Sequence, residues 1–203
     1  MDRGVTKSIK EGVKMIQKFK DMSDEAIYKT MSNTIFPRPV AWISSEDEGI
    51  VNLAPFSYFT PLSSNPPLVV VSIGHKEDGM PKDTMANILK HKKCTISFAH
   101  KELLEDMKNS AEALPKELSE AEHFNIKMQT VLDDFPPMVA KAKSALFCEF
   151  FQAPNLGSKT QPLILKVMEV YIDDLHVDEN DKINLENIGR VGMEYLIDST
   201  RIK

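Results

Sequence analysis

The sequence predicts a mostly β fold with helices (α+β class), built around an antiparallel barrel. Two observations lead to this fold class. At least five segments have the β-branched and apolar composition of strands, and the helical segments between them do not alternate regularly with strands as a doubly wound sheet requires. No repeat or low-complexity linker divides the 203 residues. We therefore expect one domain over residues 24–203, preceded by a helical extension over residues 1–23.

The N-terminal region has apolar residues at helical spacing. They recur from Val5 to Phe19 with lysines between them, which predicts a basic amphipathic helix over residues 5–20. Such a helix can bind a membrane surface, or it can pack on the body of the protein or on a second subunit. A second short helix is predicted over residues 24–33, and the prolines in the segment FPRP (36–39) end it.

The strand segments follow in chain order. They are VAWIS (40–44, followed by the acidic turn SEDEG), LVVVSIG (68–74), CTISFAH (94–100), SALFCEF (144–150) and PLILKVMEVYIDD (162–174). The segment LVVVSIG lacks alternation, as expected for a strand buried on both faces, and the last segment alternates imperfectly. Prolines 55, 61, 66 and 67 would interrupt ladder hydrogen bonds. The stretch NLAPFSYF and the residues after it should therefore form loop or strand edge.

Helices are predicted between these strands. Residues 82–93 form one of them, with Asp83 or Thr84 as its cap. Residues 100–124 form one or two surface helices that break near Pro115, and the C-terminal residues from 187 form a short ordered tail.

Charge and hydropathy argue against several functional classes. A formal net charge of −5 argues against general binding to nucleic acid or to anionic membranes. No apolar run approaches the roughly 20 residues that span a bilayer, and the N-terminus lacks the apolar core of a secretory signal. We therefore expect a cytoplasmic protein. Cys94 and Cys148 are interpreted as reduced core thiols, with a disulfide or a reactive thiol as the alternative.

Familiar catalytic patterns are absent from the sequence. It contains no G-x-G-x-x-G, no G-x-x-x-x-G-K-[ST] and no G-x-S-x-G. The five histidines are scattered without metal-ligand spacing, and the acidic stretch near residue 178 lacks the glycine of a calcium loop, so a solvated hairpin turn is expected there. We therefore predict no catalytic side chain and no metal site.

One segment offers chemistry of its own. The stretch GMPKDT (79–84) opens a helix, where free backbone N–H groups and the helix dipole attract an anion. Lys82 adds a positive charge and Thr84 a hydroxyl donor, a combination that suits a phosphate. The residues alone leave two readings open, a phosphate site and an ordinary capped helix.

The linked stretches RPVAWISSEDEGIVNLAPFSYF, SNPPLVVVSIG and KDTMANI closely resemble the core of the flavin reductase-like family of FMN-binding split-barrel proteins. That family's sequences read R-P-V-A-[WL]-V-[ST]-T, N-L-A-P-[FY]-S-[FY]-F, D-P-P and K-D-T-x-x-N-I in the same order. The resemblance covers residues 37–88. The tail NIGRVGMEYL is similar to the family's last motif, although Met193 stands where that motif usually has a second glycine.

The resemblance implies an antiparallel split β-barrel of the FMN-binding type. It also implies FMN as cofactor in preference to FAD, NADH or NADPH as reductant, and a homodimer. Carried over by position, the cofactor-binding residues are Ser44 and Ser45 near the ribityl chain or phosphate, Asn52, Ala54 and Ser57 at the ring edge, Phe59 in the pocket wall, and Ser72, His75, Lys82 and Thr84 around the phosphate.

Roles for neighbouring residues follow from the same comparison. Arg38 either anchors the loop or touches the ligand, and Trp42 is expected in the core. Asp83 is interpreted as a helix cap and not as an acid or base. Arg190 and Tyr195 are candidates to reach a neighbouring subunit's site.

The implied function is that of an NAD(P)H-dependent flavin oxidoreductase, which transfers a hydride from nicotinamide to flavin N5. An FMN-containing electron-transfer protein without its own nicotinamide site is the alternative. A flavin-free split barrel that serves as an interaction module is a third possibility.

Overall fold

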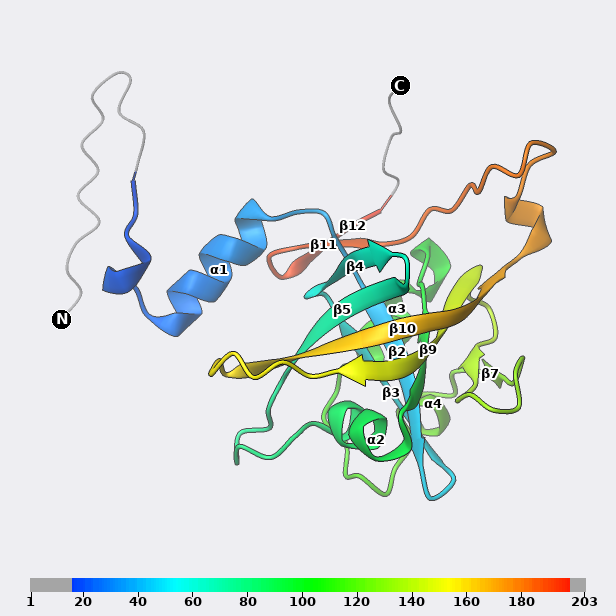
Figure 1. Cartoon of the computed structure of the whole chain (residues 1–203), viewed down its shortest axis with the longest axis horizontal. Coiled ribbons are helices and arrows are strands. Elements are labelled where there is room, and N and C mark those ends of the chain that lie inside the picture. Colours follow the sequence, from blue (N-terminus) through cyan, green and yellow to red (C-terminus); the bar gives the residue numbers. More distant parts are fainter. Residues whose placement is uncertain (1–15, 198–203) are drawn as a thin grey trace.

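A seven-stranded antiparallel sheet forms the centre of the computed structural model, which describes residues 16–197 (Figure 1). Its strand order is β3-β2-β6-β9-β10-β5-β4. In chain order these strands are β2 (Ala41–Asp47), β3 (Ile50–Phe56), β4 (Phe59–Ser64), β5 (Pro67–Gly74), β6 (Lys93–Ser97), β9 (Ser144–Gln152) and β10 (Thr160–Ile172). The predicted antiparallel fold of the α+β class is confirmed.

Two small sheets flank the large one. The first has the order β1-β11-β12, and the second pairs β7 with β8. Their strands are β1 (Arg38–Pro39), β7 (Met128–Gln129), β8 (Met138–Val139), β11 (Gly189–Val191) and β12 (Glu194–Leu196). The predicted ordered C-terminal tail is thus the β11–β12 hairpin, which pairs with β1 next to the end of the first helix.

The helices are short. They are α1 (Asp24–Thr34), α2 (Asp83–His91), α3 (Leu104–Asn109) and α4 (Glu120–His123), with 3-10 turns η1 (Phe19–Asp21), η2 (Lys101–Leu103) and η3 (Asp174–His176). The predicted helices at 24–33 and 82–93 are confirmed. Most of the helix predicted over 5–20 lies outside the described residues, and its end forms only η1. No helix within residues 16–197 is both long and apolar enough to cross a membrane.

The turn of the β2–β3 hairpin is shorter than the five-residue acidic turn SEDEG that the sequence predicts. Asp47 pairs with Ile50, so β2 runs through the first half of SEDEG and only two residues turn the chain. Both have positive φ, 53° at Glu48 and 80° at Gly49. Two-residue hairpins favour this left-handed geometry because it matches the twist of the strands.

Pro55 and Pro61 lie on the two edges of the large sheet, whereas Pro67 begins β5, which is an inner strand. Pro55 is in β3 and Pro61 is in β4, and these strands are the first and last in the order. Residues 57–58 join the two edges directly. The predicted strand-edge position of this stretch is confirmed, because an edge strand tolerates the missing N–H of proline.

Both faces of β2 are buried in separate apolar clusters. Trp42 packs with α3 and with the segment around β8, while Ile43 packs on the opposite face with α2. The indole N–H of Trp42 donates a 2.8 Å hydrogen bond to Ser110. Trp42 is fully buried, as predicted.

The burial of β5 differs from its prediction, and the pairing of β10 explains its imperfect alternation. In β5, only alternate residues such as Val71 and Ile73 are fully buried, so the prediction of two buried faces is wrong. Ser72 and Gly74 lie on the other face, which lines a cavity described below. In β10, the pairing with β9 shifts register around Met168, and this irregularity accounts for the imperfect alternation.

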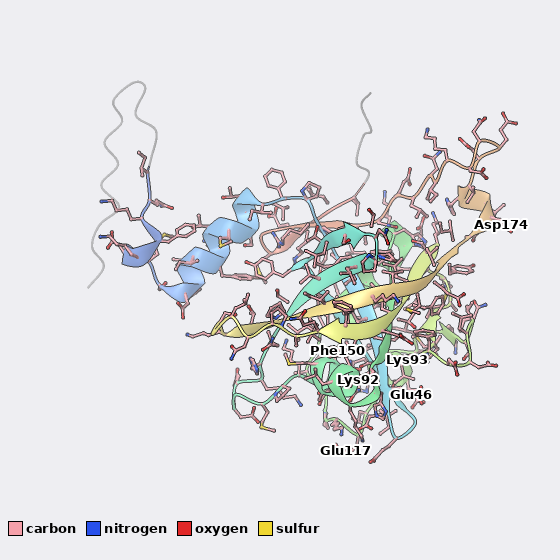
Figure 2. The ribbon with its side chains drawn as sticks, viewed as in Figure 1. Glu46, Lys92, Lys93, Glu117, Phe150 and Asp174 are labelled. Atoms are coloured by element: carbon pink, nitrogen blue, oxygen red, sulfur yellow. The ribbon has the colours of Figure 1, made fainter. Side chains whose placement is uncertain are left out.

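The two cysteines lie opposite each other across β6 and β9. Both are buried free thiols, as predicted. A hydrogen bond that the Cys148 thiol donates to Cys94, together with burial, raises the pKa of Cys148 well above its usual value. Nearby, α2 ends at Lys92, whose ammonium lies 4.6 Å from the centre of the Phe150 ring (Figure 2).

Close packing at β11 yields a prediction. A Cβ atom on Gly189 would lie 2.7 Å from Cβ of Pro37, whose ring cannot move aside. Gly189→Ala should therefore lower the free energy of unfolding by about 1–3 kcal/mol, the usual cost of overpacking, and shift the urea midpoint accordingly. Gly74→Ala is the matched control, since nothing lies within 4 Å of its added Cβ. Equal midpoints for the two variants would contradict the prediction.

Candidate functional site

A cavity of about 530 Å³ opens beside β3 and the N-terminus of α2. Three segments form its walls: the second half of β3, the chain from residue 75 into α2, and the loop at 110–114. Its lining residues are Asn52, Ala54, Pro55, Phe56, His75, Lys76, Glu77, Lys82, Asp83, Thr84, Ser110, Ala111, Glu112, Ala113, Leu114 and Glu120. This is the first cavity.

The N-terminus of α2 points its free donors into this region. Lys82 is the N-cap residue, and among the described residues no side chain caps the helix. The predicted caps are therefore wrong. Asp83 instead pairs with Lys76 at 2.8 Å, and the Thr84 hydroxyl accepts a 2.7 Å hydrogen bond from the Asn52 amide. The first backbone N–H groups of the helix lack intrahelical partners, so they remain available to a ligand.

Lys82 and Thr84 bring polar groups to the same place. The Lys82 side chain is exposed and forms no ion pair with any residue of 16–197. Thr84 is buried, and because its oxygen accepts from Asn52 its own O–H is free to donate. An ammonium group, a hydroxyl and helix N–H groups together match the needs of an anion.

Glu120 is a lining residue that the sequence analysis missed. It is only 8% exposed and accepts a 2.8 Å hydrogen bond from the backbone N–H of Leu53. Burial raises the pKa of its carboxyl. Next to it, the Ser119 hydroxyl donates to the Val51 carbonyl at 2.6 Å. These two contacts fasten α4 to the edge of β3 and so fix one wall of the cavity.

A second cavity of about 360 Å³ adjoins the first and shares Pro55, Phe56, Lys82 and Ala111 with it. Its other lining residues are Tyr28, Val40, Ser57, Tyr58, Ser72, Gly74, Thr160, Arg190 and Tyr195. Here α1 contributes a wall through Tyr28, which no sequence motif marked. Arg190 and Tyr195 line the cavity of their own chain, with the guanidinium carbon 4.1 Å from the tyrosine ring centre.

Arg38 has the contacts of an anchor. Its guanidinium donates to the carbonyls of Ser32 and Ile35, and more weakly to the Ser57 hydroxyl and the Gly192 carbonyl. The side chain is 5% exposed and lines neither cavity. It therefore ties the end of α1 and the β11–β12 turn to the segment that joins β3 and β4.

The structure divides the ten predicted ligand residues into three groups. Asn52, Ala54, His75, Lys82 and Thr84 line the first cavity, Ser57 and Ser72 line the second together with Lys82, and Ser44, Ser45 and Phe59 line neither.

The third group is held inside the protein. The Ser44 hydroxyl donates to the Pro137 carbonyl at 2.6 Å. Ser45 accepts from Asn87, and Phe59 belongs to a core cluster. These three side chains therefore pack inside the protein and line neither cavity.

A cluster of ion pairs around Asp47 holds the loop that leads into α4. Asp47, 5% exposed at the end of β2, receives Lys90 at 2.5 Å, His91 at 2.7 Å and Lys116 at 2.9 Å. Hydrogen bonds from these three groups hold the pKa of Asp47 far below its usual range. The cluster joins β2, the end of α2 and the loop before α4.

Comparison with known proteins gives consistent matches. A family model described as a flavin reductase like domain matches residues 31–187. An uncharacterised protein of Deinococcus radiodurans is 31% identical over 181 residues, which are 84% of this chain and 79% of that protein.

Solved structures agree with this match. Nitrilotriacetate monooxygenase component B from Bacillus cereus superposes with a TM-score of 0.87 at 25% identity, covering 95% of this chain and 100% of that one. An FMN-binding protein from Thermus thermophilus superposes with a TM-score of 0.72 at 19% identity, covering 84% and 92%. The predicted split-barrel fold is confirmed.

The Asp47 cluster predicts a pH-dependent stability. A carboxyl whose pKa is lower in the folded state stabilises the protein above its unfolded pKa, about 3.9, and loses that effect as the pH falls further. The loss of unfolding free energy in Asp47→Asn should therefore be largest near pH 7 and shrink below about pH 4. Urea titrations at both pH values measure it. Asp134→Asn, at an 87% exposed carboxylate 3.9 Å from Lys93, is the control. A loss that is equal at both pH values would contradict the prediction.

Proposed function

This chain belongs to the flavin reductase-like family of flavin-binding reductases, and we propose that it binds FMN and acts as an NAD(P)H-dependent flavin oxidoreductase. One observation carries the proposal. Within residues 16–197, a helix N-terminus without a side-chain cap, a lysine without an ion pair and a hydroxyl that is free to donate converge on one cavity beside the edge strand β3. These groups suit the phosphate end of a flavin mononucleotide.

The residues present fit such a ligand. Lys82 and Thr84 would hold the phosphate, with the first N–H groups of α2 as further donors. The adjacent charge of Asp83 is offset by its ion pair with Lys76. A cavity of about 530 Å³ also falls in the range of about 300–1,000 Å³ usual for cofactor sites.

The ring system would lie along β3. Asn52 presents its side-chain amide and Ala54 a small side chain on a strand with a partner on one side only. Phe56 supplies an apolar surface between the two cavities. Ser57, in the segment that joins β3 to β4, would contact the ring edge from the second cavity.

A bound flavin would supply the hydride-accepting chemistry, with NADH or NADPH as the donor. The chain itself contributes orientation and electrostatics. Asn52 holds Thr84 in place, and Glu120 fixes the strand that carries Asn52. These contacts orient the side chains that would hold the ligand.

We favour FMN over FAD because the similar Thermus thermophilus protein is an FMN-binding protein by name. We also propose that residues 24–203 form the functional domain and that the chain works as a homodimer. Chromatography with light scattering tests the dimer.

An FMN-containing electron carrier without a nicotinamide site is the second candidate. The experiment that separates the two is steady-state oxidation of NADH and of NADPH by purified protein, with and without added FMN. The proposed function predicts turnover with at least one nicotinamide and anaerobic bleaching of the flavin spectrum. FMN binding without turnover would leave the electron carrier. No flavin binding at all would overturn both.

Lys82→Ala should weaken FMN binding by about tenfold or more, since a hydrogen bond to a charged group typically contributes about 1.5–3 kcal/mol. Flavin fluorescence titration measures the dissociation constant. Lys141→Ala is the control, because Lys141 is exposed and lines neither cavity. An unchanged affinity in Lys82→Ala would place the phosphate elsewhere.

A further inference from the structure

An arm formed by residues 173–188 leaves the end of β10, projects beyond the large sheet and turns back to β11 (Figure 1). Of its residues only Ile188 is buried. Two backbone hydrogen bonds hold the ends of the arm. The Asp173 N–H donates to the Lys143 carbonyl at 2.9 Å, and the Ile188 N–H donates to the Ala99 carbonyl at 2.9 Å. A segment that buries so little surface opens at a low cost in free energy.

A buried histidine lies where the arm returns to the body of the protein. His100 directly follows Ala99 and is 8% exposed. Its Nε2 atom lies 3.0 Å from a carboxylate oxygen of Glu102. Its Nδ1 atom is buried and has no hydrogen-bond partner within residues 16–197. Because a carboxylate only accepts hydrogen bonds, the proton of the neutral ring belongs on Nε2, and Nδ1 is the nitrogen that would take up a second proton.

The charged and titratable groups around His100 come from three elements. They are Lys143, just before β9, His176 of η3 in the arm, and Lys101 and Glu102 of η2. Burial, followed by the positive charge of Lys143, lowers the pKa of His100 below its ordinary value, and His176 acts in the same direction. Glu102 opposes this shift, but its carboxylate is 73% exposed and water screens its charge.

Protonation of His100 under the closed arm is costly for two reasons. The new N–H at Nδ1 would be buried without an acceptor, and the new positive charge would lie near that of Lys143. Opening of the arm would remove His176 and Ile188 from beside His100, so water could solvate the charged ring. The neutral ring therefore favours the closed arm, and the protonated ring favours the open arm.

We propose that His100 and the arm form a pH-sensitive switch, in which the arm is closed while the imidazole is neutral and opens when Nδ1 is protonated. His100 lines neither cavity, so this inference goes beyond the proposed function. The switch acts on the second cavity from a distance. The arm leads directly into β11, and Arg190 and Tyr195 of the β11–β12 hairpin line that cavity.

Linkage gives the direction of the pH effect. The closed form binds the proton more weakly than the open form, in which a histidine has its ordinary pKa of about 6.5. The arm is therefore held most firmly above about pH 6.5. Its opening constant rises as the pH falls below that value, by up to about tenfold per pH unit, until the pKa of His100 in the closed form is reached.

The test measures opening of the arm and titration of His100 in the full chain by NMR. Hydrogen exchange at the Asp173 and Ile188 amides reports the opening, after correction for the intrinsic effect of pH on exchange. The corrected opening constant should be several-fold to about tenfold larger at pH 5.5 than at pH 7.5. The Phe150 amide, which donates to the Lys92 carbonyl within the large sheet, is the internal control and should not change. The His100 ring should titrate below pH 6.5.

Variants assign the effect to His100. His100→Phe keeps a buried ring that cannot be protonated, so it should abolish the acid-induced opening, and His100→Gln should do the same if the first variant does not fold. His123→Gln removes an exposed histidine from α4 and should leave the opening as in wild type. Lys143→Gln should raise the pKa of His100, because it removes the nearby positive charge. A purely structural role of His100 would not produce this last shift.

Three results would overturn the proposal: a pKa of 6.5 or higher for His100 in the folded protein, equal opening of the arm at both pH values, or undiminished acid-induced opening in a folded His100 variant. The first two measurements use the wild-type chain and need no variant to fold. Failure of the proposed function is distinct, because none of these measurements requires a flavin.

Discussion

An unpaired strand edge that carries proline is the constraint on which the rest of this structure depends. β3 has a strand neighbour on one side only. On its other side Ser119 and Glu120 bond the Val51 carbonyl and the Leu53 N–H. Alternation places Pro55 at the next outward position, where its ring replaces the N–H that a further strand would need. The sheet therefore stays open between β3 and β4, and both cavities lie along this opening.

The wall opposite that edge is held by polar contacts at three separate points. Ser110 accepts from the Trp42 indole, Lys116 reaches Asp47, and Glu120 binds β3. Each contact satisfies a buried group on β2 or β3 that would be costly to leave unpaired. The loop that leads from α3 to α4 is thus tied to the same two strands that carry the motif residues. The shape of the first cavity therefore follows from these two strands and from the loop that the contacts hold.

Sequence patterns predicted the strands of the sheet and its edge, because these features depend on the residues of each segment. Strand composition located the sheet, and the missing N–H of Pro55 located its edge. The cap at Asp83 was wrong because the helix begins at Asp83 itself, with Lys82 in the N-cap position, and the Asp83 carboxylate pairs with Lys76 instead. Ser44 shares a motif with ligand candidates, yet it lies on a central strand with neighbours on both sides, which the motif could not reveal. Tyr28 and Glu120 reach the cavities through tertiary packing alone, so no spacing marked them.

The residues shared by the two cavities limit the charge of the ligands that could occupy both at once. Lys82 lines both, and one ammonium group can neutralise one anion well. If Lys82 binds a phosphate in the first cavity, an anion in the second cavity must be stabilised by other charges. Two anions in adjoining cavities repel each other. Arg190 in the wall and Arg38 behind it supply those charges, and neither pairs with a described carboxylate. The buried Arg38 guanidinium also has a structural role, because it donates to the Ser32, Ile35 and Gly192 carbonyls.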